Sequence, residues 1–103
     1  MGFQFPLSLA PYDAVILPLL NRVELEELAT RIFVESRGEG LAVLYDDRGR
    51  IGRRYARADE IGIPFAVTVD PESLENGSAT IRYRDTAEQT RHPVKDIPGL
   101  LKR

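Results

Sequence analysis

Three short runs of apolar residues limit the possible folds of this chain more than any other feature. They occupy residues 14–17, 41–45 and 65–69. A strand with one wet face alternates apolar and polar residues, whereas a continuous apolar run is typical of a strand covered on both faces, as in a parallel sheet. The runs therefore predict three buried strands of a parallel sheet.

Two amphipathic segments separate these runs. The first begins with Asn21 and Glu24, a spacing similar to a capping box, and ends at Gly38 and Gly40. The second is stopped by Gly62. Alternating strands and helices predict parallel strands joined by right-handed crossovers. The apolar residues at helical spacing are Leu25, Leu28, Ala29, Ile32 and Phe33 in the first segment, and Ile51, Tyr55, Ala58 and Ile61 in the second.

The pattern changes after residue 69. Asp70-Pro71 and residues 75–77 consist of turn-forming types, which favours an antiparallel return of the chain. Residues 78–84 alternate apolar and polar, so we expect a strand with one exposed face. Residues 84–87 then read as a hairpin tip and 88–92 as an edge strand, before a short helix near the carboxyl end.

Together these patterns predict an α/β fold. We expect a single three-layer domain, with a mixed, mostly parallel five-stranded sheet and helices on both faces. At 103 residues the chain supports one core and not two. We place the domain at residues 9–103 and interpret residues 1–8 as a leading segment or the end of an excised fragment.

Composition excludes several classes of site. The chain has no cysteine, so disulfides and thiolate metal sites are excluded, and His92 is its only histidine. A net charge of −2 argues against a protein that coats nucleic acid by charge alone. A local basic face stays possible, because binding follows the field at the site. No segment has the pattern of a signal peptide or a membrane span, so we expect a cytoplasmic location.

Arginines concentrate in one short segment. Five of them lie within residues 48–57, and arginine outnumbers lysine twelve to two in the whole chain. One explanation is a GC-rich coding bias; the other is planar, bidentate recognition of phosphates or base edges. Individual arginines could equally form a solvated helix face paired with Asp59 and Glu60. For the set as a whole we favour contact with a polyanion.

Asp46 and Asp47 follow the second strand directly, where α/β folds place ligands. Catalysis by these carboxylates would need a nucleophile or a metal site, and the sequence shows neither. They serve either as a turn whose charges favour the next helix, or as partners that orient nearby arginines. We expect Tyr55 to pack in the core rather than to stack on a ligand. We assign no catalytic and no metal-binding residues.

These residues resemble one family. Residues 45–70 and 80–91 are similar to the anticodon-binding domain of class II (class IIa-type) glycyl-tRNA synthetases of the archaeal and eukaryotic kind, and the similarity extends over residues 9–101. Arg50 and Tyr83 depart from the family's pattern. The most specific motifs are Asp46-Asp47, Ile51-Gly52-Arg53-Arg54-Tyr55, Asp59-Glu60-Ile61-Gly62, Pro64-Phe65, and Arg84-Asp85-Thr86 with Gln89.

The resemblance implies recognition of the anticodon loop of glycine tRNA, whose second and third anticodon letters are cytosines. Arginines can donate to the cytosine carbonyl and to phosphates, and carboxylates can accept from its amino group. Arg91, on the expected edge strand, could extend the same basic surface. The RNA-binding residues implied are Arg53, Arg54, Arg57, Glu60, Arg82, Arg84, Asp85, Thr86 and Gln89.

The resemblance also implies what this chain lacks. The family's catalytic core is absent from these residues, so we expect no aminoacylation by this chain alone and no cofactor in this domain. ATP and magnesium belong to the catalytic domain of the parent ligase, which is the expected protein partner; neither membrane nor DNA is expected. One alternative is a regulatory or polymerase-accessory protein with the same fold. Another is a small-molecule enzyme that uses Asp46 and Asp47, which would need a pocket with perturbed carboxylates.

Overall fold

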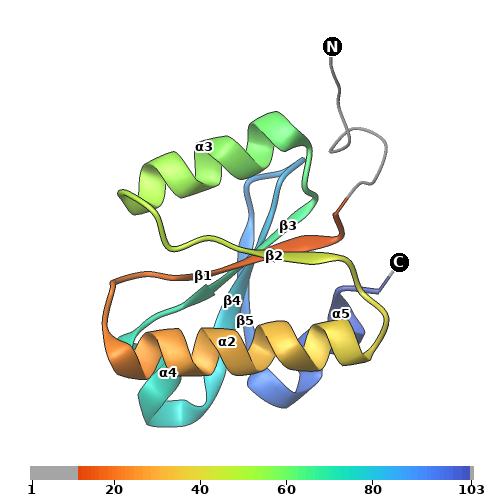
Figure 1. Ribbon diagram of the computed structural model, residues 1–103. Coiled ribbons are helices and arrows are strands. Elements are labelled where there is room, and N and C mark those ends of the chain that lie inside the picture. The colour runs from red at the N-terminus through yellow and green to blue at the C-terminus, as the bar shows by residue number, and fades with distance from the viewer. Residues whose placement is uncertain (1–11, 103) are drawn as a thin grey trace.

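The computed structural model describes residues 12–102 as a five-stranded sheet between two layers of helices (Figure 1). Predictions for residues 1–11, including the leading segment, lie outside the described residues. The strands are arranged in the order β2-β1-β3-β4-β5. Their bounds are Ala14–Pro18 for β1, Val43–Tyr45 for β2, Phe65–Val69 for β3, Ser78–Tyr83 for β4 and Gln89–Pro93 for β5.

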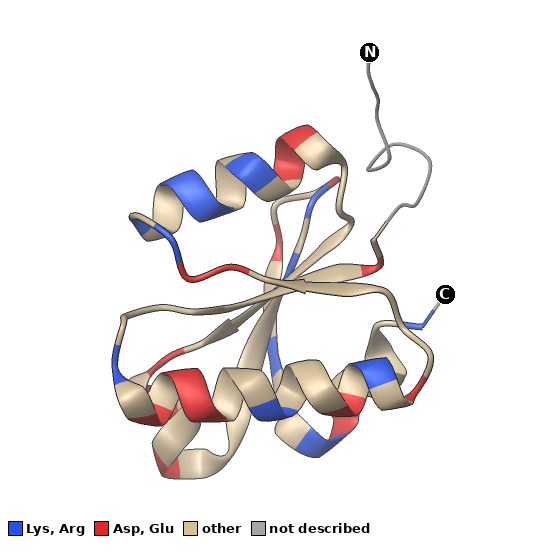
Figure 2. Cartoon of the chain, viewed as in Figure 1, with Lys and Arg blue, Asp and Glu red and all other residues tan. Residues whose placement is uncertain are grey.

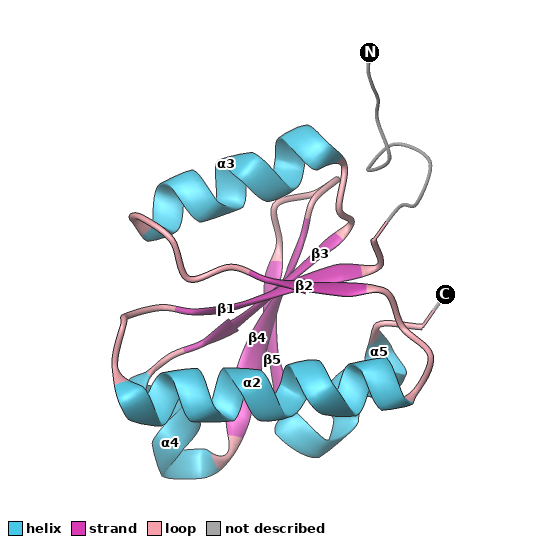
Figure 3. Ribbon diagram, in the orientation of Figure 1, coloured by secondary structure: helices cyan, strands magenta, loops and turns pink. Residues whose placement is uncertain are grey.

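The predicted mixed sheet is confirmed. Strand β1 pairs in parallel with both β2 and β3, β4 runs antiparallel to β3, and β5 antiparallel to β4. Four of the five strands therefore point in the same direction. Helix α3 (Ile51–Ile61) covers one face of the sheet. Helices α2 (Val23–Gly38), α4 (Pro71–Asn76) and α5 (Ile97–Leu100) and the short 3-10 helix η1 (Val94–Asp96) lie on the other side (Figure 3).

The apolar run of β1 reflects its cover on both faces. All five of its residues are buried. Ala14 and Ile16 pack into the cluster on the α2 side, whereas Val15 and Leu17 pack into the cluster on the α3 side. Because successive side chains of a strand point to opposite faces, a strand between two helical layers needs apolar residues at every position.

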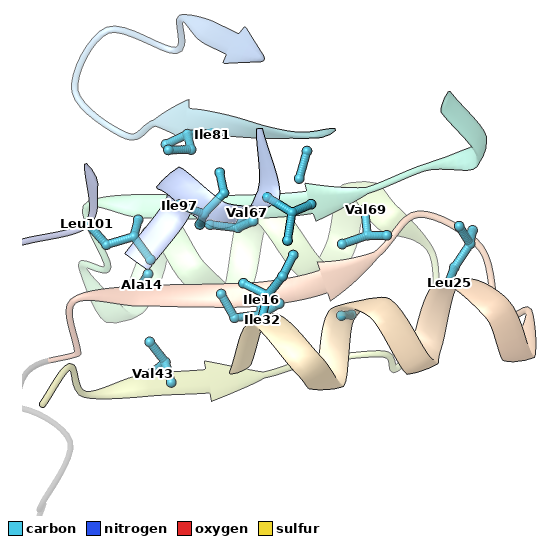
Figure 4. Packing of buried hydrophobic residues seen from close by; sticks show 13 residues of the cluster. Ala14, Ile16, Leu25, Ile32, Val43, Val67, Val69, Ile81, Ile97 and Leu101 are labelled. Atoms are coloured by element: carbon cyan, nitrogen blue, oxygen red, sulfur yellow. The ribbon is translucent and has the colours of Figure 1, made fainter. Parts of the chain in front are cut away.

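The two faces of the sheet bury unequal cores. On the α2 side, Leu25, Ala29 and Ile32 form the buried stripe of the helix and meet residues from four strands and from α5 (Figure 4). On the α3 side the buried cluster is smaller and centres on β1, Ala58 and Ala66. The α3-side face of β4 and β5 is accordingly polar, and it is this face that carries the candidate site.

The start of α2 differs from the prediction. Its N-cap residue is Arg22, with no side-chain capping bond, so the predicted Asn21 cap is wrong. The amide oxygen of Asn21 instead accepts a hydrogen bond of 3.1 Å from Nη2 of Arg54. The side-chain oxygen that the sequence pattern assigned to helix capping therefore binds Arg54, a residue far away in the sequence. Strand β2 is also shorter than predicted, because it begins at Val43 and not at residue 41.

The predicted antiparallel return after residue 69 is confirmed, but the connection is the short helix α4 rather than turns alone. Asp70 is the N-cap, and a capping box joins its side chain to the backbone and hydroxyl of Ser73. Gly77 ends the helix in the left-handed conformation, with φ of 66°. Asp-Pro and Asn-Gly serve both as turn residues and as helix termini. The sequence marked both boundaries correctly but did not reveal the six residues of helix between them.

Candidate nucleic-acid interface

The structure brings α3 and the β4–β5 hairpin together on one side of the sheet. Arg82 lies opposite Ala66 of β3 and opposite Gln89 of β5. Its guanidinium contacts Asp59 of α3, with Nη1 to Oδ1 at 3.3 Å. Nε of Arg84 donates to the main-chain carbonyl of Asp59 at 3.3 Å. The two segments that the sequence singled out, about 25 residues apart in the chain, thus form one surface.

The outward side of this surface carries exposed arginines. Arg48, Arg50 and Arg53 are exposed, and 78% of the Arg48 side chain is accessible to solvent. Figure 2 shows Lys and Arg along α3, which ends in an acidic stretch. Within residues 12–102 the guanidinium groups of Arg50 and Arg53 form no hydrogen bond or ion pair. These groups are therefore open to an anion. Glu60 is exposed on the same helix.

Asp46 orients Arg57. Its carboxylate accepts two hydrogen bonds from Arg57, from Nε at 3.0 Å and from Nη2 at 2.9 Å. The Arg57 guanidinium also donates to the carbonyl of Arg48 at 2.6 Å. The interpretation of Asp46 as a partner of nearby arginines is confirmed, and its Oδ1 also accepts a hydrogen bond of 3.0 Å from the backbone N–H of Arg48, which fits the turn interpretation.

Arg54 differs from the prediction, which placed it on the RNA-binding surface. Its residue surface is only 3% exposed. The guanidinium donates to the carbonyl oxygens of Gly49, Arg48 and Pro18 and to the side chain of Asn21. Arg54 therefore fixes the loops that follow β1 and β2. Consecutive residues of a helix point about 100° apart, so Arg53 and Arg54 lie in different environments although the motif presents them as a pair.

The hairpin tip is confirmed, and it offers both donors and acceptors. Asp85, Thr86 and Gln89 are exposed, and 44% of the Arg84 side chain is exposed beside Asp85 at 3.3 Å. The Thr86 hydroxyl is engaged with Glu88, to which it is joined through both the side chain and the backbone N–H. A carboxylate, an amide and a guanidinium in a small area match the mixed edge of an unpaired base better than a bare phosphate.

Arg91 does not extend the open basic surface. Its Nη2 contacts Oδ2 of Asp70 at 2.6 Å, its Nη1 donates to Ser78 at 2.8 Å, and Glu72 lies at 3.6 Å. Burial raises the pKa of Asp70, but the hydrogen bonds from Arg91 and Ser73 outweigh it and hold the pKa below its usual range. Arg91 therefore ties β5 to the start of α4.

Tyr55 packs in the core as predicted and also supports the surface. It contacts the α3-side cluster, its hydroxyl shares a hydrogen bond of 2.6 Å with Thr68, and the guanidinium carbon of Arg82 lies 5.0 Å from its ring centre. Sequence reasoning did not single out Thr68, because a β-branched residue inside a strand has the pattern of ordinary core.

The opposite side of the molecule has a different character. A hollow of about 810 Å³ lies there between α2 and α4, and Glu24, Glu27 and Glu35 are among its lining residues. Within residues 12–102 no group of three or more histidine, cysteine, aspartate or glutamate side chains is arranged to hold a metal ion. No helix in the same range is long and apolar enough to cross a membrane.

This domain is similar to a known family over nearly its whole length. The sequence profile of the anticodon binding domain matches residues 13–103. The chain belongs to the anticodon binding domain family. The resemblance drawn from the motifs is thereby confirmed at the level of the family.

Relatives of this chain include proteins named glycine–tRNA ligase. The chain is 46% identical over 101 residues to that of Methanothermobacter thermautotrophicus, covering 98% of this chain and 18% of the relative. It is 48% identical over 100 residues to that of Aeropyrum pernix, covering 96% of this chain and 17% of the relative. The chain thus spans about a fifth of the length of these relatives.

A solved structure shows the same fold. Prolyl-tRNA synthetase from Cryptosporidium parvum, complexed with halofuginone and AMPPNP, superposes with a TM-score of 0.80 over 94% of this chain and 22% of that protein. The sequences are 24% identical, so the likeness concerns the fold alone. It confirms the three-layer architecture predicted from the alternation of strands and helices.

Proposed function

We propose that this domain binds the anticodon loop of glycine tRNA as the recognition module of a glycine–tRNA ligase. One observation carries the proposal: α3 and the β4–β5 hairpin meet through Asp59, which joins the exposed arginines of the helix to the hairpin residues on one surface. The names of the relatives support the assignment of this domain to a glycine–tRNA ligase, and they do not favour a regulatory or polymerase-accessory protein.

The chemistry of this surface suits unstacked bases. A cytosine presents an amino donor and a carbonyl acceptor on its Watson–Crick edge, which an exposed carboxylate and a guanidinium can recognise together. Asp85 and Arg84 offer that combination at the hairpin tip, and Glu60 adds a carboxylate on α3. Arg53, Arg57, Arg82, Thr86 and Gln89 complete the proposed contact set, from which buried Arg54 is removed.

The domain contributes binding, and the chemistry belongs to another part of the ligase. We propose that a catalytic domain, which uses ATP and magnesium, is its partner in the parent protein, and that this domain itself holds no cofactor. When two linked domains bind two sites on the same tRNA, binding by one domain raises the effective concentration of the tRNA at the other. The isolated domain should therefore bind more weakly than the parent. Such a ligase acts where translation takes place, so we propose a cytoplasmic location.

Binding of a labelled anticodon stem-loop, followed by fluorescence anisotropy, tests this proposal. We expect weak binding to the glycine stem-loop, and at least tenfold weaker binding when its two anticodon cytosines are changed, since each mismatch costs about 1–3 kcal/mol. Arg84→Ala should weaken binding to the glycine stem-loop, whereas Glu27→Ala on the opposite helix should not. Equal affinity for the two stem-loops would contradict the proposal.

A further inference from the structure

Arg82 is held more firmly than the exposed arginines of the surface. Asp59 pairs with its guanidinium at 3.3 Å, and the ring of Tyr55 lies beneath it, with 5.0 Å between the guanidinium carbon and the ring centre. Tyr55 is fixed in turn, because its hydroxyl bonds to Thr68 at 2.6 Å and Thr68 is only 4% exposed. A chain of contacts thus runs from the core of the sheet to this arginine.

We propose that Tyr55, Asp59 and Thr68 position Arg82 as a specificity-determining residue for an anticodon base, and that Arg48, Arg50 and Arg53 supply affinity through phosphates alone. This inference rests on the proposed function. It assigns a positioning role to three residues that the contact set does not include.

A fixed guanidinium suits a base edge. Recognition of a base depends on donors held at set positions, and a group that is already ordered loses less conformational freedom on binding. Asp59 takes one of the five N–H groups of Arg82, and 19% of the side chain is exposed. Gln89, another residue of the proposed contact set, is the cross-strand partner of Arg82 on β5.

The ion pair with Asp59 also weakens the attraction of Arg82 for phosphates. A carboxylate at 3.3 Å offsets the positive charge, and phosphate contacts depend on net charge and on the release of counterions. Arg50 and Arg53 have no such partner among residues 12–102, and Arg48 has only a loose one at 3.8 Å. Their full charge and freedom suit contacts that carry no sequence information.

Two variants of similar chemistry separate the roles. Arg82→Gln and Arg53→Gln each remove one guanidinium, and both are measured against the glycine stem-loop and its cytosine-changed counterpart over a range of salt concentrations. We expect Arg82→Gln to reduce the ratio of the two affinities at least fivefold with little change in the salt slope. We expect Arg53→Gln to weaken both complexes equally and to reduce the slope by about 0.7–0.9.

Tyr55 variants test the positioning step. Tyr55→Leu removes the ring under Arg82 and should reduce the affinity ratio as Arg82→Gln does. Tyr55→Phe keeps the ring and loses the bond to Thr68, so its ratio should lie between that of Tyr55→Leu and that of the unmodified chain. Circular dichroism confirms that each variant is folded; if Tyr55→Leu is not, Arg82→Gln and Tyr55→Phe decide the outcome.

The possible failures are distinct. If the unmodified chain does not discriminate between the stem-loops, the proposed function falls and this inference with it. If it discriminates and Arg82→Gln keeps the full ratio, only the inference is overturned. A loss of discrimination in Arg53→Gln equal to that in Arg82→Gln also overturns the division of roles.

Discussion

Arg53 and Arg54 show how two identical neighbours acquire opposite roles. Arg53 is exposed, whereas Arg54 is buried and satisfies carbonyl oxygens at the ends of two strands. Arginine suits such a position because its planar fork presents five donors to several acceptors at once. A buried guanidinium with this many partners contributes to the fold of the loops around it rather than to a surface charge.

Truncation of these two arginines should have very different effects on stability. We expect Arg54→Ala to lower the free energy of unfolding by about 2–4 kcal/mol, because it opens a cavity and leaves buried carbonyls without donors. Arg53→Ala, one residue away and exposed, should change it by less than about 0.5 kcal/mol. Urea denaturation of both variants checks this. Similar losses in the two would show that Arg54 is not the structural residue described here.

Among the elements, α4 is attached to the sheet by a charged contact. Asp70 caps the helix through Ser73 and also receives Arg91 from β5. The pKa of Asp70 is lower in the folded chain than its ordinary value. A depressed carboxyl pKa contributes stability above the unfolded value of about 3.9, and that contribution is lost as the pH falls through the lower folded value.

Asp70→Asn should remove this dependence on pH. Asparagine can still cap the helix but cannot pair with Arg91 as a charge, so we expect a loss of about 1–2 kcal/mol at pH 7. The difference from the unmodified chain should shrink towards zero as the pH falls from about 5 to below 3. Urea denaturation across this pH range measures it. Glu75→Gln, an exposed change on the same helix, should show no such trend; a constant difference for Asp70→Asn would contradict the role of its charge.

The hairpin between β4 and β5 contains an unusual backbone conformation. Ala87 has φ of 60°, and its N–H donates to the carbonyl of Tyr83 at 2.7 Å. This left-handed conformation costs a non-glycine residue about 1–2 kcal/mol. The hairpin tip that carries Arg84, Asp85 and Thr86 therefore retains its shape at some cost in stability.

Ala87→Gly should stabilise the domain. Removing the left-handed penalty outweighs the extra freedom of glycine in the unfolded chain, so we expect a gain of about 0.5 kcal/mol. Gly62→Ala is the matched control, since Gly62 has φ of 89° with no atom within 4 Å of an added Cβ. It should destabilise by about 1 kcal/mol. Thermal unfolding compares the two, and a loss of stability in Ala87→Gly would contradict the argument.

At the scale of the whole molecule, charge is divided between the two sides of the sheet. The side of α3 presents open arginines, whereas the hollow beside α2 and α4 is lined by three glutamates together with Arg31 and Lys95. The net charge of −2 hides this polarity. RNA should therefore approach from one side only, because the local field governs association.

The salt dependence of binding should report only the α3 side. We expect the affinity for the glycine stem-loop to fall with a logarithmic slope of about −2 to −3, as for three or so phosphate contacts. Glu27→Gln, on the α2 side, should leave that slope unchanged. Anisotropy titrations at several salt concentrations measure both. A change in slope caused by Glu27→Gln would show that the RNA reaches the opposite face.

The sequence predicted the fold well, because hydrophobic periodicity is a local signal. The apolar runs of β1 and β3, the stripe of α2 and the glycine stop at Gly62 all appear in the structure. Errors arose where local chemistry has two uses. Asn21 is a residue type that often caps helices, but here it accepts a hydrogen bond from Arg54. Asp70 is a residue type common in turns, but here it is the N-cap of α4.

The sequence by itself determined the order of the elements, the segments that carry charge and the family. Only the tertiary structure decided which charges are available. It buried Arg54, tied Arg57 to Asp46 and Arg91 to Asp70, and set Arg82 over Tyr55. The physical reason is that periodicity along a chain reports on which face of an element is covered. The pairing of one charge with another depends on distances between residues far apart in the sequence.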